Sequence, residues 1–518
     1  MMQEFFGKPF RIALLSLVGL LAFSAVGYFF YLEPILLIVL ALVTGIASYK
    51  KLEWGLVIVF LELMSNAHGQ LFFHSVGSFV ISARMVIFLA LFIGWGISIL
   101  SKRSVVRWKD ERVQLFLPLI LAIACGFLVG MIRRSPLDVF RDGNAYLYLF
   151  YLLPILHVDW DTIKQRVVLQ FLAAGTIFTS IISIIILYAY THFSEPFLKA
   201  VYVFLRDIRF AEITRLQFGM YRIFEQTQLF VFIFGLILIP RLFFPQSKKD
   251  RLLTMAILSL VFTAALIGMS RSFWLGLIVA GLVILFSFIF LKRPGFKDAF
   301  LGSLRICLCV FIAGLLLVGT VLFPWPHDRS SGDALTSIFG SRLSESDVAV
   351  SSRWNLLQPM LETIKDSPIV GNGFGQTVTF KTDDPRVRAI HPDGSWTTTS
   401  MEWGWFELWL KMGIFALIGF AVLFVLFVRR ISILFSTPKM WLGIWVISSL
   451  VFLYVTHMFS PYLNHPIGIG TILMLFIFLP PDLRIRPFAF GHLFKQKMSQ
   501  PMFATSSVQT IKTKSDLL

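Results

Sequence analysis

Apolar stretches follow one another along the chain from residue 12 to residue 479, with short polar or basic segments between them. Many run for about 17 to 25 residues, the length that a helix needs to cross a hydrocarbon core of roughly 30 Å. Helices are the expected form, because in lipid every backbone N–H and C=O must be satisfied within its own segment. The pattern predicts an all-α polytopic membrane protein with about 12 to 14 transmembrane helices. The predicted spans centre on residues 11–30, 33–49, 52–66, 79–100, 113–132, 144–157, 167–190, 227–244, 252–269, 273–291, 302–323, 404–427, 440–459 and 466–480.

The composition excludes a soluble globular protein. Hydrophobic residues make up 57% of the chain and charged residues 14%, with a mean hydropathy of +0.79. The usual charged share is about 25%. The three cysteines, Cys125, Cys307 and Cys309, lie inside apolar runs and are interpreted as packing residues, not as a disulfide framework or a zinc site.

Lysine and arginine gather in alternate connecting segments. If the N-terminus is cytoplasmic, every segment on that side is basic, as the positive-inside rule requires. The net charge of +17 is then mostly a consequence of topology, and no basic and aromatic pattern indicates nucleic acid. We expect a multi-pass protein of the bacterial inner (cytoplasmic) membrane with both termini cytoplasmic. Its predicted parts are transmembrane helices in 1–323, a periplasmic loop in 324–403, transmembrane helices in 404–480 and a basic, disordered cytoplasmic tail in 481–518.

The predicted periplasmic loop contains two local motifs. Its middle predicts an amphipathic helix that ends at Ser367-Pro368. The apolar side of this helix is expected to carry Trp354, Leu357, Leu361 and Ile364. The stretch Gly371–Gly375 predicts a tight turn and not a nucleotide loop, because no strand precedes it and no helix-opening Lys-Ser or Lys-Thr follows.

Two arginines next to predicted spans are candidates for an anion site. Arg271 lies between two spans with only a few residues to turn in, and an arginine at a helix centre costs about 2.5 kcal/mol or more. It either snorkels to head groups or faces a partner. Arg222 and Glu225 would share one helix face if the next span starts early, and could simply pair with each other. Two arginines at one membrane surface nevertheless suit a pyrophosphate, because guanidinium is always charged and binds phosphate oxygens in a fork.

Further candidates lie in the loop and after it. Arg353 opens the loop helix and His391 lies further along; each is either a solvated residue or part of the site. Glu402 lies at the loop-to-membrane junction among tryptophans, where burial would raise its pKa and suit it to act as a base, although a structural ion pair is an equal alternative. Lys411 lies within a predicted span and needs a partner, such as an acidic residue of another helix.

Two histidines flank the last predicted outer turn. His457 and His465 have no carboxylates near them in the sequence, and such a pair is a poor metal site. We therefore predict no metal and no cofactor.

At these residues the chain resembles the O-antigen ligase and O-antigen polymerase family of lipid-linked glycan transferases. The resemblance covers roughly residues 210 to 430 with specific motifs and the rest only in hydropathy. The motifs are Ser270–Ser272, Ser352–Trp354, Asp366–Gly375 and Phe406–Phe415. The resemblance implies about a dozen spans with one large periplasmic loop, similar to the GT-C glycosyltransferase type.

The resemblance also implies roles for the candidate residues. In ligases of this family, paired arginines hold the pyrophosphate of an undecaprenyl-linked glycan, which assigns substrate binding to Arg222 and Arg271, with Arg353 as a loop contributor. Family ligases commonly carry a catalytic histidine in a His-Asn pair, at the position that Glu402 occupies here. Either Glu402 takes the base role, or His391 folds back into the site, or the acceptor chemistry differs.

The expected function is that of a metal-independent, inverting glycosyltransferase at the periplasmic face. It would move a glycan from an undecaprenyl-pyrophosphate donor to a hydroxyl of a glycan or lipid-core acceptor, as a ligase or as a polymerase. Expected partners are these substrates, membrane lipid and other polysaccharide-assembly membrane proteins, with no nucleic acid. The alternatives are a transporter or flippase of small anions or lipid-linked glycans, which the missing internal repeat disfavours, and a non-catalytic scaffold.

Overall fold

Long apolar helices dominate the structure, as the repeated apolar runs predict. The computed structural model describes residues 4–77, 79–102, 111–216, 220–244, 246–290, 294–325 and 348–480. In this part of the chain, nine helices are long and apolar enough to cross a membrane. They are α1 (Lys8–Phe30), α2 (Glu33–Lys50), α4 (Ala83–Leu100), α8 (Thr162–His192), α11 (Lys248–Gly268), α12 (Arg271–Phe290), α13 (Phe296–Val321), α18 (Ile414–Ile431), which continues into the 3-10 helix η5 (Ser432–Ser436), and α19 (Met440–His457). The protein is an all-α polytopic membrane protein.

Shorter helices complete the bundle. Three of them are apolar: α5 (Leu117–Arg133), α10 (Gln228–Arg241) and α20 (Pro466–Phe476). The other short elements are α3 (Leu52–Ser65), η2 (Glu111–Leu115), α6 (Pro136–Gly143), η3 (Asn144–Tyr151), α7 (Leu152–His157), α9 (Glu195–Asp207), α15 (Val348–Asp366), α16 (Pro385–Arg388), α17 (Gly404–Met412) and η6 (Tyr462–Asn464). The span expected over 144–157 is helical throughout, but it begins as the 3-10 helix η3 and continues as α7. The predicted tail, 481–518, lies outside the described residues.

In the described residues, three antiparallel hairpins, which the apolar pattern does not predict, occupy connecting segments. They are β1 (Phe73–Val76) with β2 (Phe79–Ser82), β3 (Glu212–Arg215) with β4 (Tyr221–Phe224), and β5 (Val378–Lys381) with β6 (Ser395–Thr398). Each strand has four residues, too short for an alternating pattern to stand out beside the long apolar runs.

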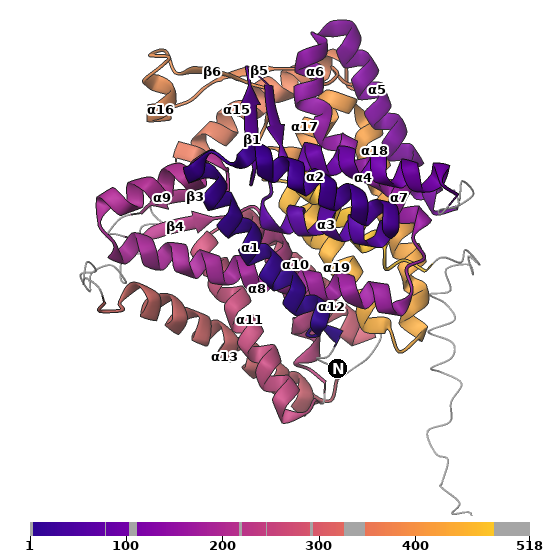
Figure 1. Ribbon diagram of the computed structural model, residues 1–518, viewed down its shortest axis with the longest axis vertical. Coiled ribbons are helices and arrows are strands. Elements are labelled where there is room, and N and C mark those ends of the chain that lie inside the picture. The colour runs from indigo at the N-terminus through magenta and orange to yellow at the C-terminus, as the bar shows by residue number, and fades with distance from the viewer. Residues whose placement is uncertain are drawn as a thin grey trace, which may run out of the picture. The chain divides into compact units, whose positions relative to one another are not determined.

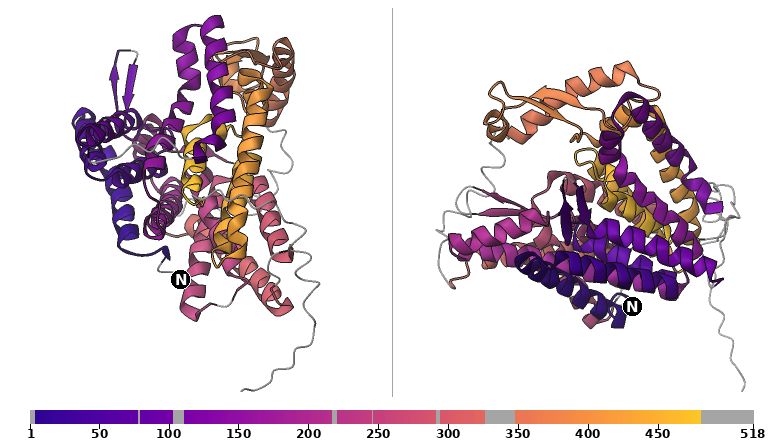
Figure 2. Two further views of the ribbon diagram at one scale, coloured as in Figure 1. Left: turned by 90° about the vertical axis from the view of Figure 1, so that its right-hand side faces the viewer. Right: turned by 45° about the horizontal axis from the view of Figure 1, so that its top comes forward.

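The helices pack in pairs that are often distant in sequence. Helix α12 packs along α19, α11 along α13, α1 along α8, and α5 along α18, while α2 lies against α4 (Figure 1). Figure 2 shows the β1–β2 hairpin and the arm formed by α15, β5, α16 and β6 at the same end of the molecule. This arrangement gathers the connecting segments that carry the candidate residues.

The amphipathic helix of the loop forms as predicted but with a rotated apolar side. Helix α15 ends at Asp366, just before Ser367-Pro368. Its buried line is Leu356, Met360 and Ile364, packed against Met401, Trp403 and Leu410. The expected members Leu357 and Leu361 are half-buried, whereas Trp354 is 60% exposed. The helix therefore faces the junction that follows β6, with Trp354 turned outward.

Gly413 divides the predicted span 404–427 into two helices. Its φ is 68°, in the left-handed region, and a Cβ placed there would lie 2.0 Å from the carbonyl oxygen of Ile369. Glycine is required on both counts. The short helix α17 therefore belongs with the loop, and the crossing helix α18 begins at Ile414.

We expect Gly413→Ala to destabilise the protein by about 1 to 3 kcal/mol, because the added Cβ meets backbone atoms at a left-handed φ. Thermal unfolding in detergent measures this. Gly314→Ala on α13 is the matched control, since nothing lies within 4 Å of the Cβ that it adds. Equal melting temperatures for the two variants would show that Gly413 imposes no such constraint.

Candidate functional site

Arg222 lies against the turn that carries Arg271. Its Nε donates to the carbonyl oxygen of Gly268 at 2.9 Å, and its guanidinium lies 4.7 Å from the centroid of the Phe224 ring. Gly268 ends α11, and Met269 turns the chain with a left-handed φ of 44°. Arg271 then opens α12 and is exposed. The two arginines that the sequence groups together are thus carried by one β4–α11–α12 corner.

The expected common helix face for Arg222 and Glu225 is wrong. Arg222 lies on strand β4, paired with Thr214 of β3, and helix α10 begins only at Gln228. Glu225, between strand and helix, is fully buried and accepts a hydrogen bond of 2.8 Å from the hydroxyl of Ser183. Burial raises the pKa of Glu225 to about 8, so its neutral form predominates at pH 7.

The turn between α19 and α20 connects the arginine corner to the loop. The hydroxyls of Ser272 and Ser460 lie 2.9 Å apart. Phe459 packs on Trp403 at a centroid distance of 5.4 Å, and Tyr462 packs on Phe273 at 5.5 Å. This final turn, residues 457–465, therefore lies between the two parts of the candidate site.

Both histidines of the final turn are used in packing. The backbone N–H of Leu463 donates to Nδ1 of His457 at 3.1 Å, and the His457 ring packs on Trp405. His465 packs edge-on against His68 at 5.2 Å. Burial, together with the nearby Arg209 and Arg84, lowers the pKa of His68 to about 4. In the described part of the chain, no three His, Cys, Asp or Glu side chains are grouped so as to hold a metal ion.

Glu402 is exposed and ion-paired, contrary to the expected burial. Arg353 Nε donates to Glu402 Oε2, with the two side chains 32% and 52% exposed. Nε1 of Trp403 donates to the carbonyl oxygen of Arg353 at 2.8 Å, and Trp354 packs edge-on against Trp403. Met401 and Trp403 are both buried, so the intervening Glu402 points outward. The structural ion pair is the alternative that the structure contains.

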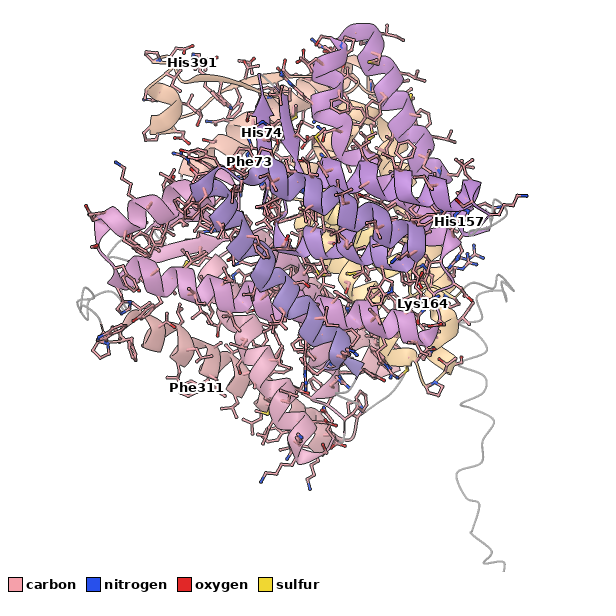
Figure 3. All side chains as sticks on the ribbon, in the orientation of Figure 1. Phe73, His74, His157, Lys164, Phe311 and His391 are labelled. Carbon is pink, nitrogen blue, oxygen red and sulfur yellow. The ribbon has the colours of Figure 1, made fainter. Side chains whose placement is uncertain are left out.

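His391 lies at the other end of strand β6 from Glu402. It follows α16, is exposed, and its ring lies 6.3 Å from that of Trp396. Figure 3 shows it near the tip of the arm. The structure thus brings Arg353 and Glu402 together and leaves His391 on a separate part of the arm.

The acidic partner expected for Lys411 is present. Lys411 Nζ lies 2.6 Å from Oδ1 of Asp142, on α6, and 2.5 Å from Oε1 of Glu407. Asp142 itself was missed, because the short segment between the predicted spans 113–132 and 144–157 showed no pattern of its own. Its position between two spans was the available signal.

The tight turn predicted at Gly371–Gly375 forms and docks on this ion cluster. Gly371, Gly373 and Gly375 have φ of 84°, 84° and 82°. The N–H of Gly373 donates to the carbonyl oxygen of Lys411 at 3.0 Å, and the N–H of Gly375 donates to Oδ2 of Asp142 at 2.7 Å. The turn thus fastens the loop to α6 and α17.

A second buried ion pair was also missed. Arg84 donates through Nε and Nη2 to both carboxylate oxygens of Glu62, at 3.2 and 3.0 Å. Both residues lie in predicted spans, where an ionisable side chain signals a partner in the fold. This pair joins α3 to α4, on elements other than the loop arm.

The architecture and the site define a multi-pass membrane protein with cationic side chains gathered on its connecting turns. Residues 255–421 match the family model described as O-antigen ligase. The match runs from α11 into α18 and includes Arg271, Arg353 and Glu402, whereas Arg222 precedes it. No curated protein and no solved structure matches the chain. A match to this family indicates a glycosyl-transfer function with lipid-linked glycans.

We expect Glu402→Gln to change the free energy of unfolding by less than about 1 kcal/mol, because its ion pair with Arg353 is exposed and screened by water. Thermal unfolding of the detergent-solubilised variant checks this. A large loss of stability would mean that the pair has a structural role that its exposure conceals. If the Glu402→Gln variant keeps its stability, any loss of activity is caused by the loss of the carboxylate and not by unfolding.

Proposed function

We propose that the protein is a glycosyltransferase that moves a glycan from an undecaprenyl-pyrophosphate donor to an acceptor hydroxyl. The observation that carries this proposal is the corner that holds Arg222 and Arg271, joined through Ser272 and Ser460 to the loop with Glu402. Guanidinium groups suit a pyrophosphate, and an exposed carboxylate on the loop suits an acceptor hydroxyl.

In the proposed reaction, the bond between the anomeric carbon and the pyrophosphate oxygen breaks as the acceptor oxygen bonds to that carbon. The leaving pyrophosphate keeps the electron pair of the broken bond. Arg271 and Arg222 would stabilise this developing negative charge, and preorganised charge of this kind is often the largest catalytic contribution. The positive charge thus comes from the chain itself, without a metal or cofactor. A single displacement inverts the anomeric configuration.

The acceptor hydroxyl gives its proton to a base, for which Glu402 is our candidate. Its carboxylate is 52% exposed, so a substrate can reach it, and it lies in an ion pair with Arg353. Arg353 would bind substrate from the same position. The aromatic rings of Trp354 and Trp403 at this junction offer surfaces on which sugar rings stack.

The distribution of lysine and arginine favours the periplasmic face of the bacterial inner membrane for this site. The connecting segments that carry Arg222, Arg271 and Glu402 all fall on the side opposite to the basic segments. An acceptor on a lipid core would make the enzyme a ligase, and an acceptor on a second repeat unit would make it a polymerase. Membrane lipid and other polysaccharide-assembly membrane proteins are the proposed partners.

Arg271→Ala is expected to abolish polysaccharide assembly while leaving membrane insertion intact. Loss of the guanidinium removes charge stabilisation of the leaving pyrophosphate, at a cost of roughly 100-fold or more in turnover. The measurement is the surface polysaccharide of cells in which the variant replaces the native chain, together with the lipid-linked glycan that accumulates. Arg141→Ala, which removes another exposed arginine on α6, is the matched control. Unchanged polysaccharide in an inserted Arg271→Ala protein would rule out this mechanism.

Glu402→Gln and His391→Gln separate the two candidate bases. If Glu402 accepts the proton, Glu402→Gln lowers turnover by about 100- to 10,000-fold, whereas His391→Gln keeps it near the native value. Release of polyprenyl pyrophosphate in proteoliposomes that contain donor and envelope lipid extract measures this. The opposite order would transfer the base role to His391.

A further inference from the structure

The Asp142–Lys411–Glu407 cluster is the most completely buried ionic group of the loop-to-helix junction. The three side chains are 8%, 4% and 3% exposed. Lys411 Nζ uses its three donors on Asp142, on Glu407 and on the carbonyl oxygen of Thr399, the last at 2.9 Å. A buried charge is tolerated only when it is paired and hydrogen-bonded, and this ammonium is fully satisfied.

The cluster joins three separate segments of the chain. Asp142 comes from α6, Glu407 and Lys411 from α17, and Thr399 from the segment that follows β6. Glu407 holds this last segment a second time, because its Oε2 accepts the backbone N–H of Met401 at 3.3 Å. The backbone is thus fixed at two points within the three residues that precede Glu402.

Glu402 needs this support because little else holds it. Its side chain is more than half exposed, and it forms an ion pair with Arg353 of α15, whose own side chain is 32% exposed. An exposed ion pair between flexible side chains gives little positional restraint. The position of the carboxylate therefore depends on the backbone from Thr399 to Met401.

We propose that Lys411, with Glu407 and Asp142, is a positioning group that sets the place of Glu402 relative to the arginine corner. This inference rests on the proposed function, in which Glu402 is the base. It assigns a role to the motif Phe406–Phe415 and to the Gly371–Gly375 turn, because Asp142 also accepts the N–H of Gly375. A misplacement of about 1 Å in a reacting group can cost on the order of 100-fold in rate.

Glu407→Gln is the most selective test. One side-chain oxygen can still accept from Lys411, but the amide N–H₂ then faces the N–H of Met401, two donors that repel each other. The charge of the cluster becomes balanced, so the protein should fold. We expect turnover to fall by about 10- to 100-fold with the KM for the donor unchanged, because the arginine corner is untouched.

A double-mutant cycle with Glu402→Gln identifies the route of this effect. If Glu407 acts through Glu402, the double variant is about as slow as Glu402→Gln alone. Release of polyprenyl pyrophosphate in the same proteoliposomes is the measurement. Losses that multiply, or native turnover in Glu407→Gln, would overturn the inference.

Arg84→Lys is the matched control, because it weakens the other buried ion pair, with Glu62, which joins α3 to α4 and holds none of the residues next to Glu402. Arg84→Lys should lower the melting temperature without lowering turnover. A loss of turnover equal to that of Glu407→Gln would mean that the Glu407→Gln effect is caused by lost stability alone. If Glu402→Gln is itself fully active, the base of the proposed function fails. If it is inactive while Glu407→Gln is normal, only the positioning role fails.

Discussion

A charge inside an apolar interior must find a partner, and this requirement organises the structure. Among the described residues whose burial is known, three glutamates are buried, and each meets the requirement in its own way. Glu62 shares both oxygens with Arg84, and Glu407 pairs with Lys411. Glu225 accepts from Ser183 and is neutral at pH 7, because burial raises its pKa to about 8. Replacing one partner leaves the other uncompensated, so each arrangement fixes the elements that contribute to it.

The candidate site has the opposite character. Arg271, Arg353 and Glu402 are exposed or half-exposed, and the contacts that place them are made by their neighbours. Ser272, one residue after Arg271, bonds to the final turn. The buried residues next to Glu402 pack under α15. The candidate side chains are thus exposed while adjacent residues supply the rigidity, an arrangement expected of sites built on a preorganised scaffold.

Hydropathy was sufficient for the fold class and for the order of most helices, because long apolar runs have few other stable forms in lipid. Helix α15 and the turn at Gly371–Gly375 followed from strong local signals, the first from periodicity and the second from glycine spacing. The sequence predicted the kind of partner that Lys411 has, an acidic residue of another helix, because a lysine within a predicted span needs one. Its identity, Asp142, depends on which helices meet.

Features set by tertiary contact could not be foreseen. The predicted span 404–427 is divided at Gly413 because Gly413 lies close to Ile369. No local pattern in the apolar run indicates this division. Trp354 points outward because the opposite side of α15 packs against the segment that follows β6. Glu402 was expected to be buried because tryptophans surround it in sequence, yet Trp403 packs inward and Glu402 does not. Neighbours in sequence can face opposite ways, so composition alone does not give exposure.

The contact between Ser272 and Ser460 has a consequence for biosynthesis. The arginine corner is made early, but its neighbour across the site arrives with the turn between α19 and α20, near the end of the described chain. Between the synthesis of Arg271 and that of Ser460, the nascent protein carries both arginines without the surface that closes beside them. The candidate site therefore comes together only when the last two helices have entered the membrane, which ties its formation to the completion of insertion.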